Sequence, residues 1–68
     1  MKRFNTIGER LAYLRGNRTQ KEVCEALGIS ISALSMYETN MRVPKDSIKI
    51  RLADYYQVSI LDLFYFDK

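Results

Sequence analysis

The chain has 68 residues, a net charge of +3, one cysteine and no histidine. This length allows one small domain over residues 1–68, and the lack of histidine excludes His-containing zinc sites and Ser/Cys–His catalytic pairs. With no apolar run of about 18 residues and no signal-peptide pattern, we expect a cytoplasmic protein without membrane contact.

The first predicted helix covers residues 7–15. Asn5 or Thr6 can cap its start, and Ile7, Leu11 and Leu14 share one face at helical spacing. Gly16 ends this helix, and the polar link 16–18 is short. The first helix is therefore expected to pack across the next one.

The second predicted helix covers residues 20–27 and begins with a capping box. The Thr19 hydroxyl can accept from the backbone, and Glu22, three residues on, can return a bond to the cap. Val23, Ala26 and Leu27 lie on one face of this helix and are expected to be buried. Gly28 follows directly and can adopt the left-handed conformation that ends a helix.

A third helix over residues 31–38 follows almost at once, with Ser30 as its N-cap. Leu34 and Tyr37 form its inward stripe. A link this short prevents antiparallel packing, so the two helices must cross steeply as a helix-turn-helix. Cys24 suits the close approach at the crossing, and we expect a small buried side chain there rather than a reactive thiol.

Residues 39–44 have no helical period and are predicted to form a loop. Asn40 is the residue best suited to a positive φ there, and Pro44 favours an extended entry into a fourth helix. That helix runs from 45 or 46 to 56. Its expected buried residues are Ile48, Leu52, Ala53 and either Tyr55 or Tyr56.

The segment 60–68 is short and strongly apolar, with Ser59 and Asp62 repeating the capping pattern. Its aromatic residues can fold back onto the core of the subunit or form a two-fold contact between subunits. We favour a homodimer, because large exposed apolar patches are rare on monomers. The expected dimer contacts are Leu61, Phe64, Tyr65 and Phe66.

Five helices and no strand predict an all-α bundle. The helix-turn-helix pattern is followed by Tyr37-Glu38, by Arg42-x-Pro44 and by the run 52–59. With these motifs the chain resembles the Xre-type, Cro- and repressor-like DNA-binding domains of phages and bacteria, over residues 7–64. The resemblance implies a compact five-helix lambda-repressor-like fold that binds double-stranded DNA, usually as a dimer that controls transcription.

The resemblance also implies roles for particular residues. It assigns base contacts in the major groove to Ile31, Ser32, Ser35 and Met36, a DNA-backbone contact or a bracing role to Gln20, and a structural ion pair to Arg15 and Glu38. The helical period agrees with the base contacts. When Leu34 and Tyr37 face inward, the four residues assigned to base contacts face outward. Arg18, Lys21, Arg42 and Lys45 are expected to contact the DNA backbone as cations, and Thr39 and Asn40 as neutral donors.

Charge supports this surface, because residues 1–44 carry seven basic and four acidic side chains, whereas residues 45–68 carry four of each. Ser32 and Ser35 discriminate weakly between bases, and Ile31 and Met36 can contact thymine methyl groups or another protein. We expect a dimeric repressor of phage or mobile-element type on a palindromic operator, open to control by a protein antagonist. The alternative is a protein-interaction module. An enzyme is not expected, since the carboxylates are scattered and no glycine-rich phosphate loop or cofactor motif occurs.

Overall fold

The computed structural model describes residues 6–65 and contains five α-helices and no strand in that range. In chain order they are α1 (Ile7–Arg15), α2 (Gln20–Leu27), α3 (Ile31–Glu38), α4 (Asp46–Tyr56) and α5 (Ile60–Phe64). These bounds confirm the helices expected from the sequence and the all-α fold.

Hydroxyl side chains begin four of these helices. Thr6, Ser30 and Ser59 each accept a hydrogen bond from the backbone N–H three residues on. Thr19 does the same, and Glu22 returns a bond to the Thr19 N–H, which completes the predicted capping box. Each bond satisfies a backbone donor that the first helical turn leaves without a partner.

Left-handed residues end two of the helices. Gly28 has φ 71° at the end of α2, as expected, and its N–H donates to the Cys24 carbonyl at 2.8 Å. Gln57 has φ 61° at the end of α4, where the sequence gives no glycine or asparagine to signal it. Asn40 has φ 63°, which confirms the expectation for that residue.

One hydrophobic core joins the five helices. Its completely buried side chains are Val23, Leu11, Leu34, Leu52 and Leu63. The prediction that Ala26 is buried was wrong, because the inward face of α2 carries Cys24 beside Val23 and Leu27, and Ala26 is exposed. The buried face of α2 differs from the predicted one because α2 packs against both α3 and α4. On α4, the tyrosine in the core is Tyr56, at 7% exposure.

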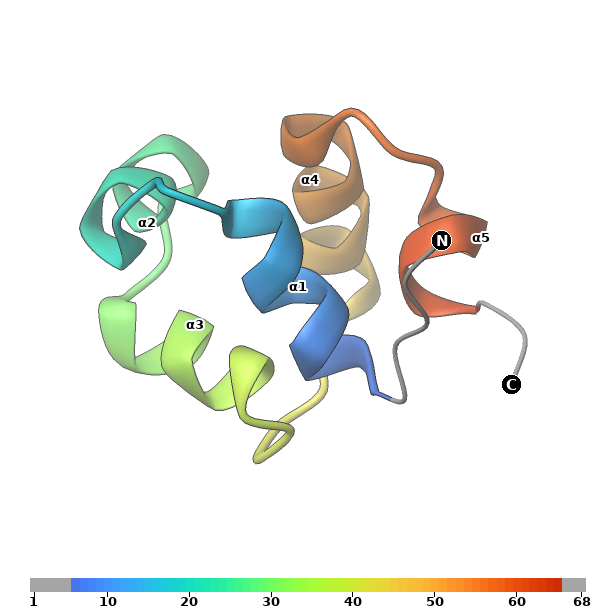
Figure 1. Cartoon of the computed structure of the whole chain (residues 1–68), viewed down its shortest axis with the longest axis horizontal. Coiled ribbons are helices and arrows are strands. Elements are labelled where there is room, and N and C mark those ends of the chain that lie inside the picture. The colour runs from blue at the N-terminus through green and yellow to red at the C-terminus, as the bar shows by residue number, and fades with distance from the viewer. Residues whose placement is uncertain (1–5, 66–68) are drawn as a thin grey trace.

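The helices are arranged so that the two crossing helices α2 and α3 occupy one end of the molecule and α5 the other (Figure 1). Helix α1 lies between them and packs mainly on α3 and α5, so the prediction that it packs across α2 was wrong. The Cα atoms extend over 30 × 22 × 22 Å. Among the described helices, none has the length and apolar character needed to cross a membrane.

Candidate DNA-binding site

Helix α3 is fixed by an inward stripe and presents its opposite face to solvent. Leu34 is completely buried and Tyr37 is 8% exposed, as expected. On the other face Ile31 is 48% exposed and Ser32 is also exposed. Ser35 and Met36 are half-buried, so the open part of the predicted base-contacting set is at the N-terminal half of α3.

The corner between α2 and α3 is held by Cys24. Its Sγ–H donates to the Ser30 carbonyl at 3.3 Å, and its own carbonyl accepts from the Ile29 N–H at 3.1 Å. Burial raises the pKa of the Cys24 thiol, which therefore stays protonated and able to donate. The thiol is thus a small structural side chain, as the sequence indicated.

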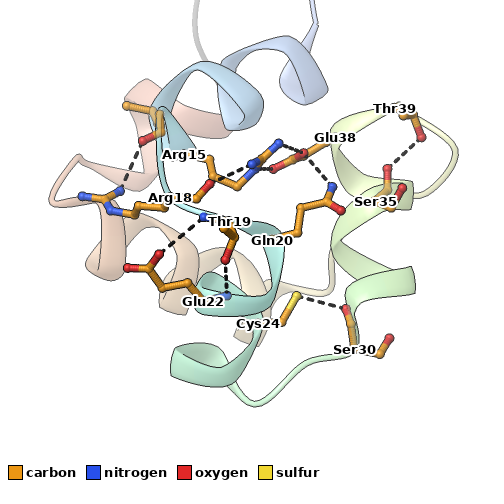
Figure 2. A network of polar contacts seen from close by, with 11 residues as sticks. Arg15, Arg18, Thr19, Gln20, Glu22, Cys24, Ser30, Ser35, Glu38 and Thr39 are labelled. Carbon is orange, nitrogen blue, oxygen red and sulfur yellow. Dashed lines mark hydrogen bonds and ion pairs between the residues drawn. The ribbon is translucent and has the colours of Figure 1, made fainter.

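The far end of α3 is held by one carboxylate that two other helices share (Figure 2). Arg15, at the end of α1, donates from Nε to Oε2 of Glu38 at 2.8 Å and from Nη2 to Oε1 at 3.1 Å. Gln20, the first residue of α2, donates from Nε2 to the same Oε1 at 3.1 Å. The structure therefore contains the predicted ion pair and gives Gln20 the bracing role.

This network is shielded from water on its acidic side. The Glu38 side chain is 6% exposed and that of Arg15 is 23% exposed. The hydrogen bond to Glu38 raises the pKa of Arg15, so the cation persists throughout the ordinary pH range. Arg15 also donates from Nη1 to the Arg18 carbonyl at 2.8 Å, which fixes the link between α1 and α2. The fork geometry favours one orientation of α3 relative to α1.

Arg18 is exposed, and its guanidinium also has partners within the subunit. Its guanidinium carbon lies 5.3 Å from the Tyr55 ring centroid and 5.6 Å from that of Tyr56, both on α4. Its Nη1 donates to the Leu14 carbonyl at 3.3 Å. These contacts hold the cation against α4, and the expected phosphate contact of this exposed residue stays a prediction.

Thr39 and Asn40 also have internal partners. The Thr39 hydroxyl donates to the Ser35 carbonyl at 2.8 Å and closes the last turn of α3. The Asn40 Oδ1 accepts from the Gly8 N–H at 3.0 Å, and its Nδ2 donates to the Thr6 hydroxyl at 3.1 Å. These bonds use the Thr39 hydroxyl proton and one of the two Asn40 Nδ2 protons within the subunit, and the expected role of both residues as neutral phosphate donors stays a prediction.

Three of the predicted backbone-contacting cations remain available. Lys21 on α2, Arg42 in the loop 39–45 and Lys45 at the start of α4 are exposed, and none forms an ion pair with another residue in 6–65. Arg42 and Lys45 follow directly after α3, whereas Lys21 is on the first turn of α2. Exposed cations are thus present on α2 and in the segment that follows α3.

A helix-turn-helix family model matches residues 10–63 of this chain. The chain belongs to the Xre/Cro-like helix-turn-helix family. It is a DNA-binding regulator of this type, and the matched range includes the whole of α2 and α3. The comparison with curated proteins gave no match.

At the opposite end of this helix-turn-helix domain, the predicted dimer contacts divide into two groups. Leu61 is 65% exposed and Tyr65 is 58% exposed. Phe64 is only 6% exposed and belongs to the core of the subunit, so its prediction as a dimer contact is corrected. The fourth expected contact, Phe66, lies outside the described residues.

Lys49 fixes the position of Tyr65, a role that the sequence did not indicate. Its Nζ donates to the Tyr65 hydroxyl at 3.1 Å and lies 4.9 Å from the centroid of that ring. The same ammonium lies 5.5 Å from the Phe64 ring centroid. A lysine sixteen residues earlier in the chain gives no local signal of this contact.

The helix-turn-helix domain also contains one buried hydroxyl without a hydrogen-bond partner among residues 6–65. This is the hydroxyl of Tyr56, on the face of α4 that packs into the core. Desolvation raises the pKa of Tyr56 from 10.0 to about 12, because burial penalises the phenolate.

This raised pKa predicts a loss of stability in alkali. The stability that the raised pKa of Tyr56 contributes is fully present below the unfolded-state pKa of about 10. It is lost as the pH rises through the folded-state pKa. Between pH 10 and 12, the free energy of unfolding of the wild-type protein should fall more steeply than that of Tyr56→Phe, by up to about 2–3 kcal/mol. Urea unfolding at successive pH values measures this difference.

Tyr13→Phe is the matched control, because it removes the hydroxyl of a tyrosine that is 59% exposed. The change in slope in Tyr56→Phe should exceed the change in Tyr13→Phe. If the free energy of unfolding fell equally with pH in the wild type and in Tyr56→Phe, the raised pKa of Tyr56 would be contradicted.

Proposed function

We propose that this protein is a sequence-specific transcriptional repressor of phage or mobile-element type that binds a palindromic operator as a homodimer. The observation that supports this proposal most is that α3 is fixed at one end and exposed at the other. Its C-terminal end is fixed by Arg15, Gln20 and Glu38, while Ile31 and Ser32 at its N-terminal end are exposed. An α-helix held in this way can enter the major groove with its first turns against the bases.

The chemistry of this open turn favours particular bases. Ile31 has no hydrogen-bonding side-chain group, and its apolar surface suits the thymine C5-methyl group. Ser32 can donate to or accept from several base edges and therefore adds little discrimination alone. Half-sites rich in A·T pairs follow from this combination. Ser35 and Met36, which are half-buried, would contact the edge of the groove.

Phosphate contacts would come from the exposed cations around α3. Arg42 and Lys45 follow α3 in the chain, and Lys21 is on α2. Each phosphate neutralised by a cation releases counterions, so the affinity should decrease strongly with salt. These contacts supply affinity and orientation rather than sequence preference.

A second copy of the chain is the partner that suits α5. Leu61 and Tyr65 are large apolar side chains exposed at the end of the molecule opposite α2 and α3 (Figure 1). The proposal requires that two subunits meeting at α5 place their α3 helices on half-sites about 34 Å apart. Two copies also double the small set of base contacts that one α3 offers.

The alternative function is a protein-interaction module with weakened DNA readout. Exposed apolar side chains favour it, because Ile31 on α3 and Met41 and Val43 in the following loop are 48%, 76% and 65% exposed. A protein partner whose binding is lost in Met36→Asp, together with indifference to DNA, would support this alternative.

Selection of bound duplexes from a random pool, at a low and a moderate salt concentration, tests the proposed function directly. We expect enrichment of a two-fold-symmetric sequence with A·T-rich half-sites about 10 base pairs apart. No enrichment at either salt concentration would contradict sequence-specific binding.

Substitutions at Arg42 and Ser32 should separate affinity from specificity. Arg42→Ala should weaken binding to all duplexes alike and reduce the slope of log affinity against log salt by about 1. Ser32→Ala should instead leave the salt slope unchanged and alter, by a small factor, the base preference at one position in each half-site. Fluorescence anisotropy with the enriched duplex and its single-base variants measures both effects. A base-specific change in Arg42→Ala, or none in Ser32→Ala, would contradict the assigned roles.

A charge on α5 should separate the subunits. Leu61→Asp places a carboxylate in the proposed contact, so the dimer should dissociate at concentrations where the wild type remains dimeric. Met41→Asp adds the same charge to a residue that is 76% exposed in another part of the surface and should leave the dimer intact. Sedimentation equilibrium compares the three proteins. A monomeric wild type, or a dimer unaffected by Leu61→Asp, would contradict the proposed interface.

A further inference from the structure

The side chain of Asn40 joins the end of α3 to the start of α1. Its Oδ1 accepts from the Gly8 N–H at 3.0 Å, and its Nδ2 donates to the Thr6 hydroxyl at 3.1 Å. The same hydroxyl accepts from the Glu9 N–H at 3.1 Å as the N-cap of α1. A residue 32 positions later in the chain thus completes the capping of the first helix.

The two backbones are in direct contact at this point. A Cβ atom added to Gly8 would lie 2.4 Å from the Glu38 carbonyl oxygen and 2.9 Å from the Asn40 Nδ2. The first turn of α1 therefore lies against the last turn of α3 with no space for a side chain between them. At this separation, a change in the position of either backbone moves the other.

Asn40 is also a rigid extension of α3. Its N–H donates to the Tyr37 carbonyl at 3.3 Å, and the next N–H, of Met41, donates to the Met36 carbonyl at 2.9 Å. The Thr39 hydroxyl closes the same turn through the Ser35 carbonyl. Asn40 has a positive φ, 63°, and its side chain reaches the start of α1. A bond made by the Asn40 side chain is therefore transmitted to the axis of α3.

We propose that Asn40 is a positioning residue for DNA recognition, which fixes the tilt of α3 on α1 through the Gly8 N–H and the Thr6 hydroxyl. This role rests on the proposed sequence-specific function and adds a second restraint to that of Glu38. The Glu38 carboxylate restrains α3 towards the end of α1 and the start of α2, whereas Asn40 restrains it towards the start of α1. The two side chains hold the C-terminal end of α3 to the two ends of α1, so the position of that end relative to α1 depends on both.

A direct contact between Asn40 and a DNA phosphate is the competing role for this side chain. Such a contact carries no sequence information, so its loss lowers the affinity for every duplex by the same factor. Loss of a positioning residue has a different result. The first turn of α3 then meets the bases at a wrong angle, and only the affinity for the preferred duplex decreases.

The test compares Asn40→Gly with Asn40→Asp. Glycine accepts the positive φ but removes both tertiary bonds. Aspartate tolerates the same φ, keeps an acceptor for the Gly8 N–H and can accept from the Thr6 hydroxyl. The measured quantity is the ratio of affinities for the duplex enriched from the random pool and for a scrambled duplex of the same composition, at one salt concentration.

We expect Asn40→Gly to reduce this ratio about tenfold, the scale of the two lost hydrogen bonds, with the affinity for the scrambled duplex unchanged. Asn40→Asp should lower both affinities through its added negative charge and keep the ratio. Amide hydrogen exchange of the free proteins provides an independent readout. The Gly8 N–H should lose protection in Asn40→Gly and retain it in Asn40→Asp.

Ala53→Gly is the stability control. It destabilises α4 and leaves the bonds from Asn40 to Gly8 and Thr6 in place. Its affinity ratio should equal that of the wild type at a temperature where all variants are folded by circular dichroism. An unchanged ratio in Asn40→Gly, or equal losses for both duplexes, would overturn the positioning role. A wild type that does not distinguish the two duplexes would instead contradict the proposed function.

Discussion

The Glu38 carboxylate is the interaction on which the arrangement of the helices around the site depends. It accepts from Arg15 at the end of α1 and from Gln20 at the start of α2, and it is itself the last residue of α3. With 6% of its side chain exposed, it requires these donors, because a buried carboxylate without partners is strongly unfavourable. Three helix ends therefore meet at one charge, and the relative positions of α1, α2 and α3 follow from it.

This restraint explains how so small a domain presents a defined surface. A domain of 68 residues buries a smaller share of its surface than a larger one, so polar contacts matter more beside packing. Leu34 holds the middle of α3, the Glu38 network holds its C-terminal end, and the Cys24 thiol holds the residue before its first turn. The side chains of Ile31 and Ser32 are then left free on a helix whose backbone is fixed. Preorganisation of this kind lowers the cost of binding a rigid partner such as a DNA duplex.

The fold was predictable from the sequence where the signals are local, and less so where they depend on tertiary contacts. Capping residues such as Thr19 and helix-ending residues such as Gly28 act on their neighbours in the chain. The start and end of each helix could therefore be predicted from such signals. The side-chain bonds of Asn40 and the stacking of Arg18 on α4 join residues far apart in the chain, and charge alone suggested phosphate contacts for Arg18. The burial of Ala26 was mispredicted because periodicity does not show which neighbours a short helix will have.

We propose that the first turn of α3 meets the duplex while the α5 end of the same subunit does not. Two-dimensional NMR of the ¹⁵N-labelled protein, titrated with the enriched duplex, measures this residue by residue. The account predicts that the amide signals of Ile31, Ser32 and Arg42 shift most, and that Asp54, on the exposed face of α4, shifts little. Large shifts confined to α4 and α5, with Ile31 and Ser32 unchanged, would contradict it.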